Sequence, residues 1–543
     1  MSNQLLQTKS EKHGGFAKTV LNQIDDSLTR QPQLWTCGLL VSGLMARIWH
    51  ASGTYLHPDE ALHFFIGSKG SWIETYRASL SLSHPPLFIF LLHTWRALGT
   101  SELWLRIPSI VAGLFFCWCA FRWLKKLFSP AVAWAGFVFV LFLPSSIDLS
   151  TEIRQYAVLL AFCMGAAYLL ELAFEKDSAA CMLGSGLCLC LAIASHYSSF
   201  LFAAVLGLYA VSRIVRHHPA LKVIATWETG VIAAFGLAYF FYVSHLATLG
   251  QRYGGGSATQ GWMAGSYLGN SYYVPGKISP LLFIVARTGG AFQYIFGQSV
   301  VGDLALLAFA AGVFLALKHT ALLTRFQICV LLLLPFALNC AAALLRLYPY
   351  GGTRHSSFLI PFAITGTSVA AARSVKDSRA KALLSVLAIA LLCNLFPSHR
   401  ENLAKNHRIP DMRAALYFIQ QEVAPQDVIF TDYESSLVLG YYLCDHSPAP
   451  ASRLIPGFLS YQCGGHRVIA TDWNNETFNA ENFPRVWPKM ISDFKIPEES
   501  RVWVAEMGVP LAPNSELAQA SKSGHAFGPQ IHIFSLQGAA LTR

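Results

Sequence analysis

Four ionisable side chains, His57, Asp59, Glu60 and His63, lie within seven residues of one another near the start of the chain. Adjacent carboxylates face different directions in any regular structure, so one can accept a proton while the other orients or pairs. Partial desolvation near lipid raises the pKa of a carboxyl group, which suits a general base. The structural alternative is that Asp59, which follows Pro58, caps the start of a helix.

Four further groups of polar residues border apolar runs. They are His84 before two prolines, Glu152 with Arg154 and Tyr156, the pair His196 and Tyr197, and Arg354. Charges this close to a membrane span are usually functional or paired, and an arginine can hold a phosphate through two hydrogen bonds. Each group also has a structural interpretation, such as a helix start at His84, a surface ion pair at Glu152 or an interfacial anchor at Arg354.

The elements that must position these residues are apolar helices. Of the 543 residues, 54% are hydrophobic and only 13% are charged, against roughly 25% charged in average soluble domains. Apolar runs of about 16–20 residues recur, which is close to the length that crosses a hydrocarbon core. They predict about eleven spans, near residues 34–50, 103–124, 131–147, 154–174, 180–195, 198–214, 226–245, 301–317, 326–345, 357–372 and 380–397.

Two further apolar stretches are not counted as spans. Leu87 to Leu98 is too short and follows Pro85-Pro86, so it predicts an interfacial or re-entrant helix. Leu281 to Gly297 contains Arg287 and a glycine pair, which predict an interrupted segment beside the membrane.

The charge distribution predicts the orientation. The net charge of +10 comes from short basic clusters between apolar runs, as expected of cytoplasmic loops, and no basic patch with interleaved aromatic residues indicates nucleic acid. With the N-terminus in the cytoplasm, these clusters fall inside. The loops 51–102, 148–153, 196–197, 246–300 and 346–356 then fall outside, with everything after residue 398. All five groups of polar residues therefore share one membrane face.

The predicted organisation has three parts: a cytoplasmic leader over residues 1–33, a transmembrane catalytic domain over 34–397, and a polar domain over 398–543 outside the cytoplasm. In the last part, Asp411 to Val423 fits an amphipathic helix. Short β-prone runs follow at 428–430, 467–470, 502–505 and 531–534, so this part predicts an α/β domain. Cys444 and Cys463 lie there, and an oxidising compartment would allow them to pair.

At these residues the sequence resembles the GT-C superfamily of integral-membrane glycosyltransferases, specifically the bacterial relatives of protein O-mannosyltransferases and of lipid A aminoarabinose transferases. The motifs that carry the resemblance are Asp59-Glu60, His84-Pro85-Pro86-Leu87, Ser101-Glu102 through Ser109, Glu152-x-Arg154-x-Tyr156, His196-Tyr197, and Asp411-Met-Arg413 leading to Asp427. They cover most of the membrane portion and the start of the outer domain.

The resemblance implies a sugar donor linked to polyprenyl phosphate, an acceptor lipid, glycan or protein, and a reaction on the non-cytoplasmic face of a bacterial inner membrane. Asp59 would be the general base, Glu60 would support it, and Glu152 would be a second active-site acid. Arg154 or Arg354, with Tyr156, would hold the donor phosphate. The remaining site neighbours would be His57, His63, His84, His196 and Tyr197. Some members of the superfamily bind a divalent metal, and His57, His63 and His84 are the candidate ligands here.

Three other functions remain open. A transporter or lipid flippase would place ionisable groups at midplane depth and often shows inverted repeats, whereas here the acids collect at one face. A sugar polymerase or an O-antigen-type ligase would place its decisive loop late in the chain. A receptor or scaffold would leave the one-sided clustering unexplained.

Overall fold

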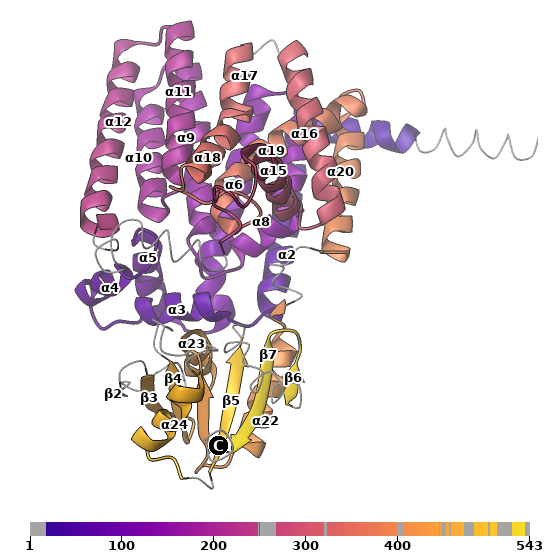
Figure 1. Ribbon diagram of the computed structural model, residues 1–543. Helices are drawn as coiled ribbons and strands as arrows, with labels where there is room; N and C mark the ends of the chain where they lie inside the picture. Colours follow the sequence, from indigo (N-terminus) through magenta and orange to yellow (C-terminus); the bar gives the residue numbers. More distant parts are fainter. Residues whose placement is uncertain are drawn as a thin grey trace, which may run out of the picture. The chain divides into compact units, whose positions relative to one another are not determined.

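The structure is a computed structural model (Figure 1). It describes residues 18–247, 249, 268–319, 323–398, 406–444, 446, 452–455, 458–471, 483–497, 500–507 and 524–537. The chain divides into two compact units. Unit 1 comprises Met1–Trp49, Tyr76–Leu91 and Arg106–Asn402, and unit 2 comprises His50–Thr75, Leu92–Leu105 and Leu403–Arg543. Of the predicted leader, residues 1–17 lie outside the described part and residues 18–30 are helical.

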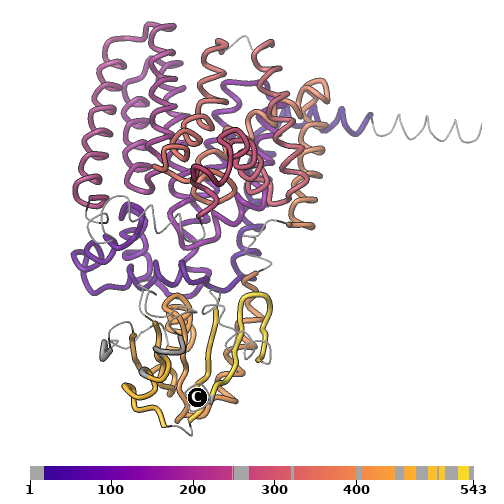
Figure 2. The backbone as a smooth tube through the Cα atoms, in the orientation of Figure 1, coloured from indigo at the N-terminus to yellow at the C-terminus, as the bar shows by residue number. Residues whose placement is uncertain are grey.

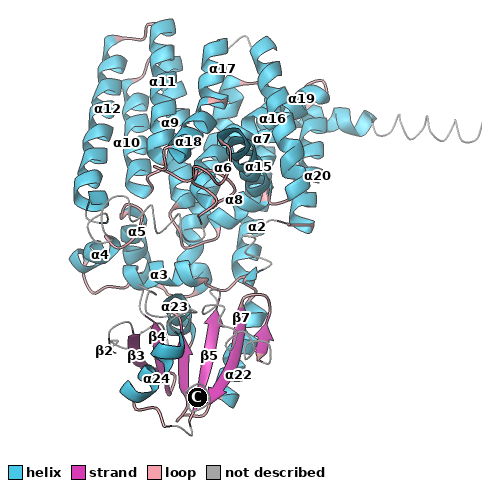
Figure 3. Ribbon diagram, viewed as in Figure 1, coloured by secondary structure: helices cyan, strands magenta, loops and turns pink. Residues whose placement is uncertain are grey.

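Unit 1 is built from helices (Figure 3). In chain order, including helices that continue into unit 2, they are α2 (Pro32–Gly53), α6 (Glu102–Leu127), α7 (Pro130–Phe142), α8 (Pro144–Ser150), α9 (Tyr156–Lys176), α10 (Ala179–Ser195), α11 (Ser199–His217), α12 (Leu221–Phe241), α15 (Pro280–Phe296), α16 (Ser299–His319), α17 (Arg325–Leu332), α18 (Leu334–Leu344), α19 (Ile360–Ser374) and α20 (Arg379–Leu395). Two short helical turns are η2 (Tyr242–Leu246) and η3 (Arg354–Leu359). Each predicted span coincides with one of these helices or with a pair of them.

Side-chain caps explain where several helices begin. Four serines each accept a hydrogen bond from the backbone N–H three residues later, and they are Ser129, Ser178, Ser279 and Ser378. Thr324 and Gln327 form a reciprocal capping box at the start of α17. These caps satisfy amide groups that the helix itself leaves without an acceptor.

Two of the predicted spans, 131–147 and 326–345, are bent pairs of helices. The axes of α7 and α8 differ by 55°, and those of α17 and α18 by 46°. Pro144 and Pro335 lie just after the breaks. Proline has no amide hydrogen to donate and its ring clashes with the preceding turn, so each helix must end or kink there.

The segment around Arg287 is the helix α15, which continues through Arg287 and both glycines and is shorter than the helices that could cross a membrane. A glycine inside a helix costs only about 1 kcal/mol relative to alanine. Here the glycines allow two backbones to approach closely. A side chain at Gly352 would come within 2.6 Å of the carbonyl oxygen of Gly290. The short helix expected at 87–98 is confirmed, as α5 (Leu87–Trp95) followed by the 3-10 turn η1 (Arg96–Leu98).

The outward surfaces of the helices are apolar. On α12, Ile232, Phe235 and Tyr239 are 72%, 74% and 71% exposed, which suits a face in contact with lipid. Among the described residues, five helices are long and apolar enough to cross a membrane, or up to seven if each bent pair forms one span. The protein is therefore a multi-pass membrane protein. Helices α9 to α12 follow one another in the sequence and pack together in space (Figures 1 and 2).

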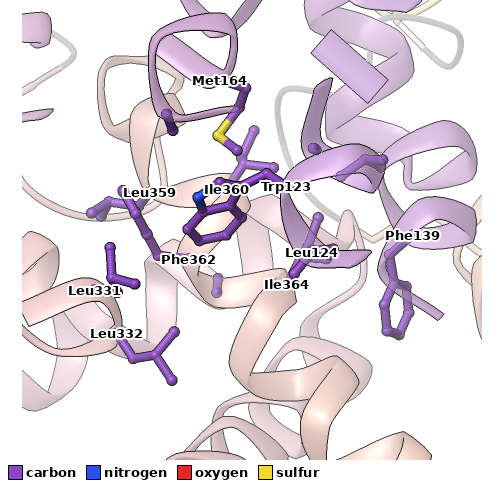
Figure 4. Close-up of a cluster of buried hydrophobic side chains, with 14 of the residues drawn as sticks. Trp123, Leu124, Phe139, Met164, Leu331, Leu332, Leu359, Ile360, Phe362 and Ile364 are labelled. Atoms are coloured by element: carbon purple, nitrogen blue, oxygen red, sulfur yellow. The ribbon is translucent and has the colours of Figure 1, made fainter. Parts of the chain in front are cut away.

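The interior of unit 1 is packed with large apolar side chains. Trp123 of α6 is 1% exposed and lies among Met164 of α9 and Ile360 and Phe362 of α19 (Figure 4). Between membrane helices, such side chains stabilise the fold through close packing. This core fixes the ends of α9 and the turn before α19, and both carry candidate site residues.

Unit 2 contains a seven-stranded sheet with the strand order β2-β3-β4-β1-β5-β7-β6. The strands are β1 (Val428–Thr431), β2 (Ser452–Ile455), β3 (Phe458–Cys463), β4 (His466–Thr471), β5 (Arg501–Met507), β6 (His525–Phe527) and β7 (Ile531–Gln537). β1 pairs in parallel with β4 and with β5, and the flanking pairs are antiparallel. The four predicted β-prone runs are confirmed as β1, β4, β5 and β7.

Helices cover both faces of this sheet. They are α22 (Ile409–Glu422), α23 (Tyr433–Tyr442) and α24 (Phe483–Asp493). Ile429 belongs to the cluster that includes α22 and α23, whereas Val428 and Phe430 belong to the cluster that includes α24. Successive side chains of a strand point to opposite faces, so a short apolar run can serve two layers. The predicted helix at 411–423 is α22, which begins two residues earlier.

The disulfide between Cys444 and Cys463 is formed, with a Cα–Cα distance of 4.8 Å. It joins the end of α23 to the end of β3. The sequence allowed this pairing without deciding it, and the ten other cysteines are free thiols.

Candidate active site

The candidate residues of unit 1 lie at the ends of helices or in the turns between them. Glu152 and Arg154 occupy the turn between α8 and α9, and Tyr156 is the first residue of α9. His196 follows the last residue of α10, and Arg354 begins η3. These segments are far apart in sequence, and the packing of the helix ends brings them together.

An ion pair connects two of these segments. Arg354 Nη1 lies 4.0 Å from Glu152 Oε2, and their side chains are only 19% and 5% exposed. Burial of both partners strengthens their attraction, because the surroundings screen charge less than water does. The Glu152–Arg354 pair therefore joins the third predicted group of polar residues to the fifth.

Arg154 adds a second guanidinium to the same region. Its guanidinium carbon lies 5.6 Å from the centroid of the Tyr156 ring, and its backbone carbonyl accepts a hydrogen bond of 3.4 Å from Ser109. The side chain of Arg154 is buried. A buried guanidinium held against an aromatic ring is positioned before any ligand arrives.

His196 lies at the centre of an aromatic group. Its ring centroid is 5.1 Å from that of Tyr156, 6.3 Å from that of His355 and 6.5 Å from that of Tyr348. Burial lowers the pKa of His196 well below its usual value. The nearby basic groups of His355, His84 and Arg154 lower this pKa further.

The hydrogen bonds of His196 agree with a neutral ring. Its Nδ1 accepts from the backbone N–H of Ser198 at 3.2 Å and from the Ser198 hydroxyl at 2.9 Å. A ring nitrogen that accepts carries no proton, so the single proton of the neutral imidazole is on Nε2. His196 therefore presents Nε2–H as a hydrogen-bond donor.

The structure thus gathers Glu152, Arg154, Tyr156, His196 and Arg354, with His84 close enough to influence His196. Tyr197 does not join this cluster. Its hydroxyl contacts His245 of η2, and its ring lies 5.8 Å from that of Phe200.

Two members of the cluster, His355 and Tyr348, were not among the predicted site residues. The Tyr348 hydroxyl donates to the backbone carbonyl of His355 at 3.1 Å. Both flank Arg354 in a loop predicted to lie on the same face as the other groups, and that position is the signal that could have identified them.

The candidate residues of the first loop belong to unit 2 and to helix α3 (Pro58–Gly67). Asp59 does not cap this helix, contrary to the structural alternative above, because His57 is the N-cap residue. His57 Nδ1 accepts from the backbone N–H of Asp59 at 3.2 Å, and the Glu60 carboxylate accepts from the backbone N–H of His57 at 3.2 Å. Glu60, only 1% exposed, thus stabilises the start of α3.

The other two candidate residues of this loop, His63 and Asp59, lie in α3 close to that cap. His63 is buried and donates from Nδ1 to the Asp59 carbonyl at 2.6 Å, one helical turn back. Asp59 itself is only partly buried. The cap and the turn fix the backbone of Asp59 on both sides, which is what a residue that acts on a substrate requires.

Unit 2 also contains a cavity of about 340 Å³. Its lining residues are Tyr55, Ser101, Glu102, Ile409, Met412, Arg413, Leu416, Tyr441, Tyr442 and His446. The Tyr442 hydroxyl donates to the Glu102 carboxylate. Helix α3 packs on α23 beside it, where the ring of Phe64 lies 5.2 Å from that of Tyr441.

The described residues were also tested as a metal site. In the parts of the chain given above, no group of three or more His, Cys, Asp or Glu side chains is placed to hold a metal ion. His57 and His63 belong to unit 2 and His84 to unit 1. No step below uses a metal.

Comparison with known proteins gives a match to a family model over part of the chain and a similar fold. Residues 83–242 match the family model described as dolichyl-phosphate-mannose-protein mannosyltransferase. No curated protein sequence matches the chain. Among solved structures, ArnT from Cupriavidus metallidurans bound to undecaprenyl phosphate has a TM-score of 0.51 at 12% identity, covering 94% of this chain and 99% of that chain.

Two other solved structures are similar at lower scores. The apo state of the same ArnT has a TM-score of 0.49 at 11% identity, with 94% and 99% of the two chains covered. The archaeal oligosaccharyltransferase AglB from Archaeoglobus fulgidus has a TM-score of 0.46 at 10% identity, with 87% and 70% covered.

The family model spans His84, Glu152, Arg154 and His196, and the similarity to undecaprenyl-phosphate-bound ArnT extends over nearly all of both chains. The motifs, the matched family and the fold therefore agree. The resemblance to the GT-C superfamily of integral-membrane glycosyltransferases is confirmed, and this chain is a multi-pass membrane protein with the helical GT-C fold and a C-terminal sheet domain.

Proposed function

We propose that the protein is an enzyme that moves a sugar from a polyprenyl-phosphate donor to an acceptor hydroxyl on the non-cytoplasmic face of a bacterial inner membrane. The observation that carries the proposal is the buried cluster of Glu152, Arg154 and Arg354. The cluster brings two guanidinium groups next to one carboxylate. A buried site of this kind suits a phosphate group.

The donor phosphate would bind to the two guanidinium groups, whose planar set of donors matches phosphate oxygens. Arg154, positioned against Tyr156, and Arg354, held by Glu152, would each bind phosphate oxygens. The Nε2–H of His196 supplies a neutral donor beside them. The solved ArnT structure contains undecaprenyl phosphate, which supports a lipid of this class as the donor carrier.

The transfer itself is a direct displacement. The acceptor oxygen attacks the anomeric carbon, the bond between that carbon and the phosphate oxygen breaks, and polyprenyl phosphate leaves with the bonding electrons. Asp59 takes the acceptor proton, and the sugar carbon inverts. The arginines stabilise the charge that grows on the leaving phosphate, while Glu60 supports Asp59 by fixing the start of α3.

The test is sugar transfer by purified protein with candidate polyprenyl-phosphate sugars, followed by mass spectrometry of the released carrier. We expect Asp59→Asn to lower the rate by about 10²–10⁴-fold, the range for loss of a general base, with normal membrane insertion. Glu74→Gln, which neutralises an exposed acid of the same loop, is the matched control. Full activity in Asp59→Asn would remove Asp59 as the base. Sugar–lipid movement across vesicles without release of the carrier would favour a flippase instead.

A further inference from the structure

The described part of unit 1 contains a cavity of about 480 Å³. Almost all of its lining residues are charged. They are Arg122, Lys125, Lys126, Glu171, Glu175, Arg213 and His217, with Leu127. They come from the C-terminal ends of α6, α9 and α11. The proposed transferase reaction uses none of them.

This cavity lies one helix length away from the candidate active site. Helix α9 begins with Tyr156 in the candidate site and ends with Lys176 beside the cavity. Its 21 residues make it about 31 Å long, close to the thickness of a hydrocarbon core. Helix α11 likewise begins next to His196 and ends at the cavity. The cavity is therefore at the opposite membrane interface.

The carboxylates of the cavity are already neutralised. Arg213 Nη2 lies 3.0 Å from Glu171 Oε2, and these side chains are only 12% and 4% exposed. Lys126 pairs with Glu175. Two cations of the wall, Arg122 and Lys125, then make no ion pair with any described residue. The cavity has four fixed positive charges against two carboxylates.

One of these remaining cations is held in place. The Arg122 guanidinium carbon lies 5.7 Å from the ring centroid of Trp118 and 5.5 Å from that of Tyr168. Contact with two aromatic rings restricts the positions that the guanidinium can take. A guanidinium that is positioned in this way can form paired hydrogen bonds with a phosphate group.

The place of the cavity identifies the source of the phosphate. The cavity lies at the ends of α6, α9 and α11, and all three helices are long and apolar enough to cross a membrane. The ends of such helices lie at the depth of lipid headgroups, so a membrane lipid presents its phosphate at this place.

We propose that this cavity binds the phosphate headgroup of an anionic membrane lipid in the leaflet opposite the candidate active site. Basic pockets between membrane helices have the charge and depth to hold such headgroups. The headgroup phosphate would contact Arg122 and Lys125. The inference is independent of the proposed transferase activity.

The test is thermal unfolding of the purified full-length protein in detergent, titrated with dioctanoyl phosphatidylglycerol, dioctanoyl phosphatidylcholine or glycerol 1-phosphate. We expect a saturable rise in Tm with phosphatidylglycerol only. Arg122→Gln/Lys125→Gln should weaken this binding roughly 30-fold, because each basic group near a membrane surface contributes about a factor of five. Both side chains are exposed, so the fold should tolerate the change.

The matched control is Lys318→Gln/Lys381→Gln, which removes two exposed positive charges outside the cavity. This control should keep the affinity of the wild type. Equal loss in both double variants would mean that only overall charge matters, and it would overturn the site. Equal stabilisation by glycerol 1-phosphate would overturn the assignment to a lipid, and unchanged binding in Arg122→Gln/Lys125→Gln would overturn the proposal as a whole.

Discussion

Single residues in this protein take their roles from their immediate partners. Glu60 is adjacent to Asp59, yet its carboxylate accepts the backbone N–H of His57 and is almost fully buried. Asp59 is more accessible. Two neighbouring acids thus have different surroundings, which favours Asp59 over Glu60 as the group that meets an acceptor hydroxyl.

Arg354 should matter more for sugar transfer than Arg346, another arginine of the same loop. We expect Arg354→Gln to lower sugar transfer by about 10²–10³-fold, the cost of losing one donor to a developing negative charge. Steady-state kinetics with a polyprenyl-phosphate sugar measures this change. Arg346→Gln removes an exposed arginine eight positions earlier and should retain the activity of the wild type. Equal activity in the two variants would contradict a role of Arg354 in phosphate binding.

His196 should make stability depend on pH. Its pKa is lowered in the folded protein, so an unfolded chain binds a proton below about pH 6.5 while buried His196 stays neutral. The unfolded state then binds more protons, and the free energy of unfolding falls as pH falls. Above about pH 6.5 the His196 side chain is neutral in both states, so it no longer makes the free energy of unfolding depend on pH.

The measurement is Tm in detergent at pH 7.5 and pH 5.5. We expect the Tm of the wild type to fall more on acidification than that of His196→Gln. His218→Asn, which replaces an exposed histidine, should behave like the wild type. An identical pH dependence in His196→Gln and the wild type would show that His196 is not held neutral.

At the scale of elements, the protein positions its polar residues at helix ends. Each residue of the Glu152–Arg354 cluster lies in a turn before or after a helix, and Asp59 lies in the first turn of α3. Two of these helices begin with proline: Pro58 is the first residue of α3, next to Asp59, and Pro144 is the first residue of α8, which ends just before the Glu152 turn. The bulk of each helix can then pack in the core without moving the polar ends.

The disulfide is the element-scale feature that is simplest to test. Cys444 and Cys463 are separated by 19 residues, and a crosslink over a loop of this size stabilises by about 3 kcal/mol. We expect Cys444→Ala/Cys463→Ala to unfold at lower denaturant concentration, followed by tryptophan fluorescence. Cys37→Ala, at an exposed free cysteine, should leave the midpoint unchanged. Non-reducing peptide mapping that finds both thiols free would contradict the pairing.

At the scale of the whole molecule, the open property is orientation in the membrane. Basic clusters at 125–126, 213–222, 318–325 and 373–381 predict cytoplasmic loops. If that orientation holds, the Glu152–Arg354 cluster faces outward and the cavity around Arg122 faces the cytoplasm. The orientation therefore decides which leaflet supplies the sugar donor.

Reporter fusions test the orientation. An alkaline phosphatase fused after residue 398 should be active, because we expect that residue to lie outside the cytoplasm, and a green fluorescent protein fused after Lys376 should fluoresce. The reverse pattern would place the sheet domain in the cytoplasm and would contradict the predicted topology.

The sequence by itself determined the elements. Long apolar runs form helices, because backbone N–H and C=O groups that are away from water must form hydrogen bonds with each other. Short β-prone runs form four strands of the sheet. It also placed Glu152, Arg154, His196 and Arg354 at helix ends. These are local properties, and they depend on residues within a turn or two.

Only the tertiary structure decided which ends meet. It paired Arg354 with Glu152, surrounded His196 with His355 and Tyr348, and turned Tyr197 toward His245 instead. It also replaced Asp59 by His57 as the cap of α3 and carried α15 through Gly290. The physical reason is that these outcomes depend on contacts between segments distant in sequence, where packing overrides the weak local preferences of single residues.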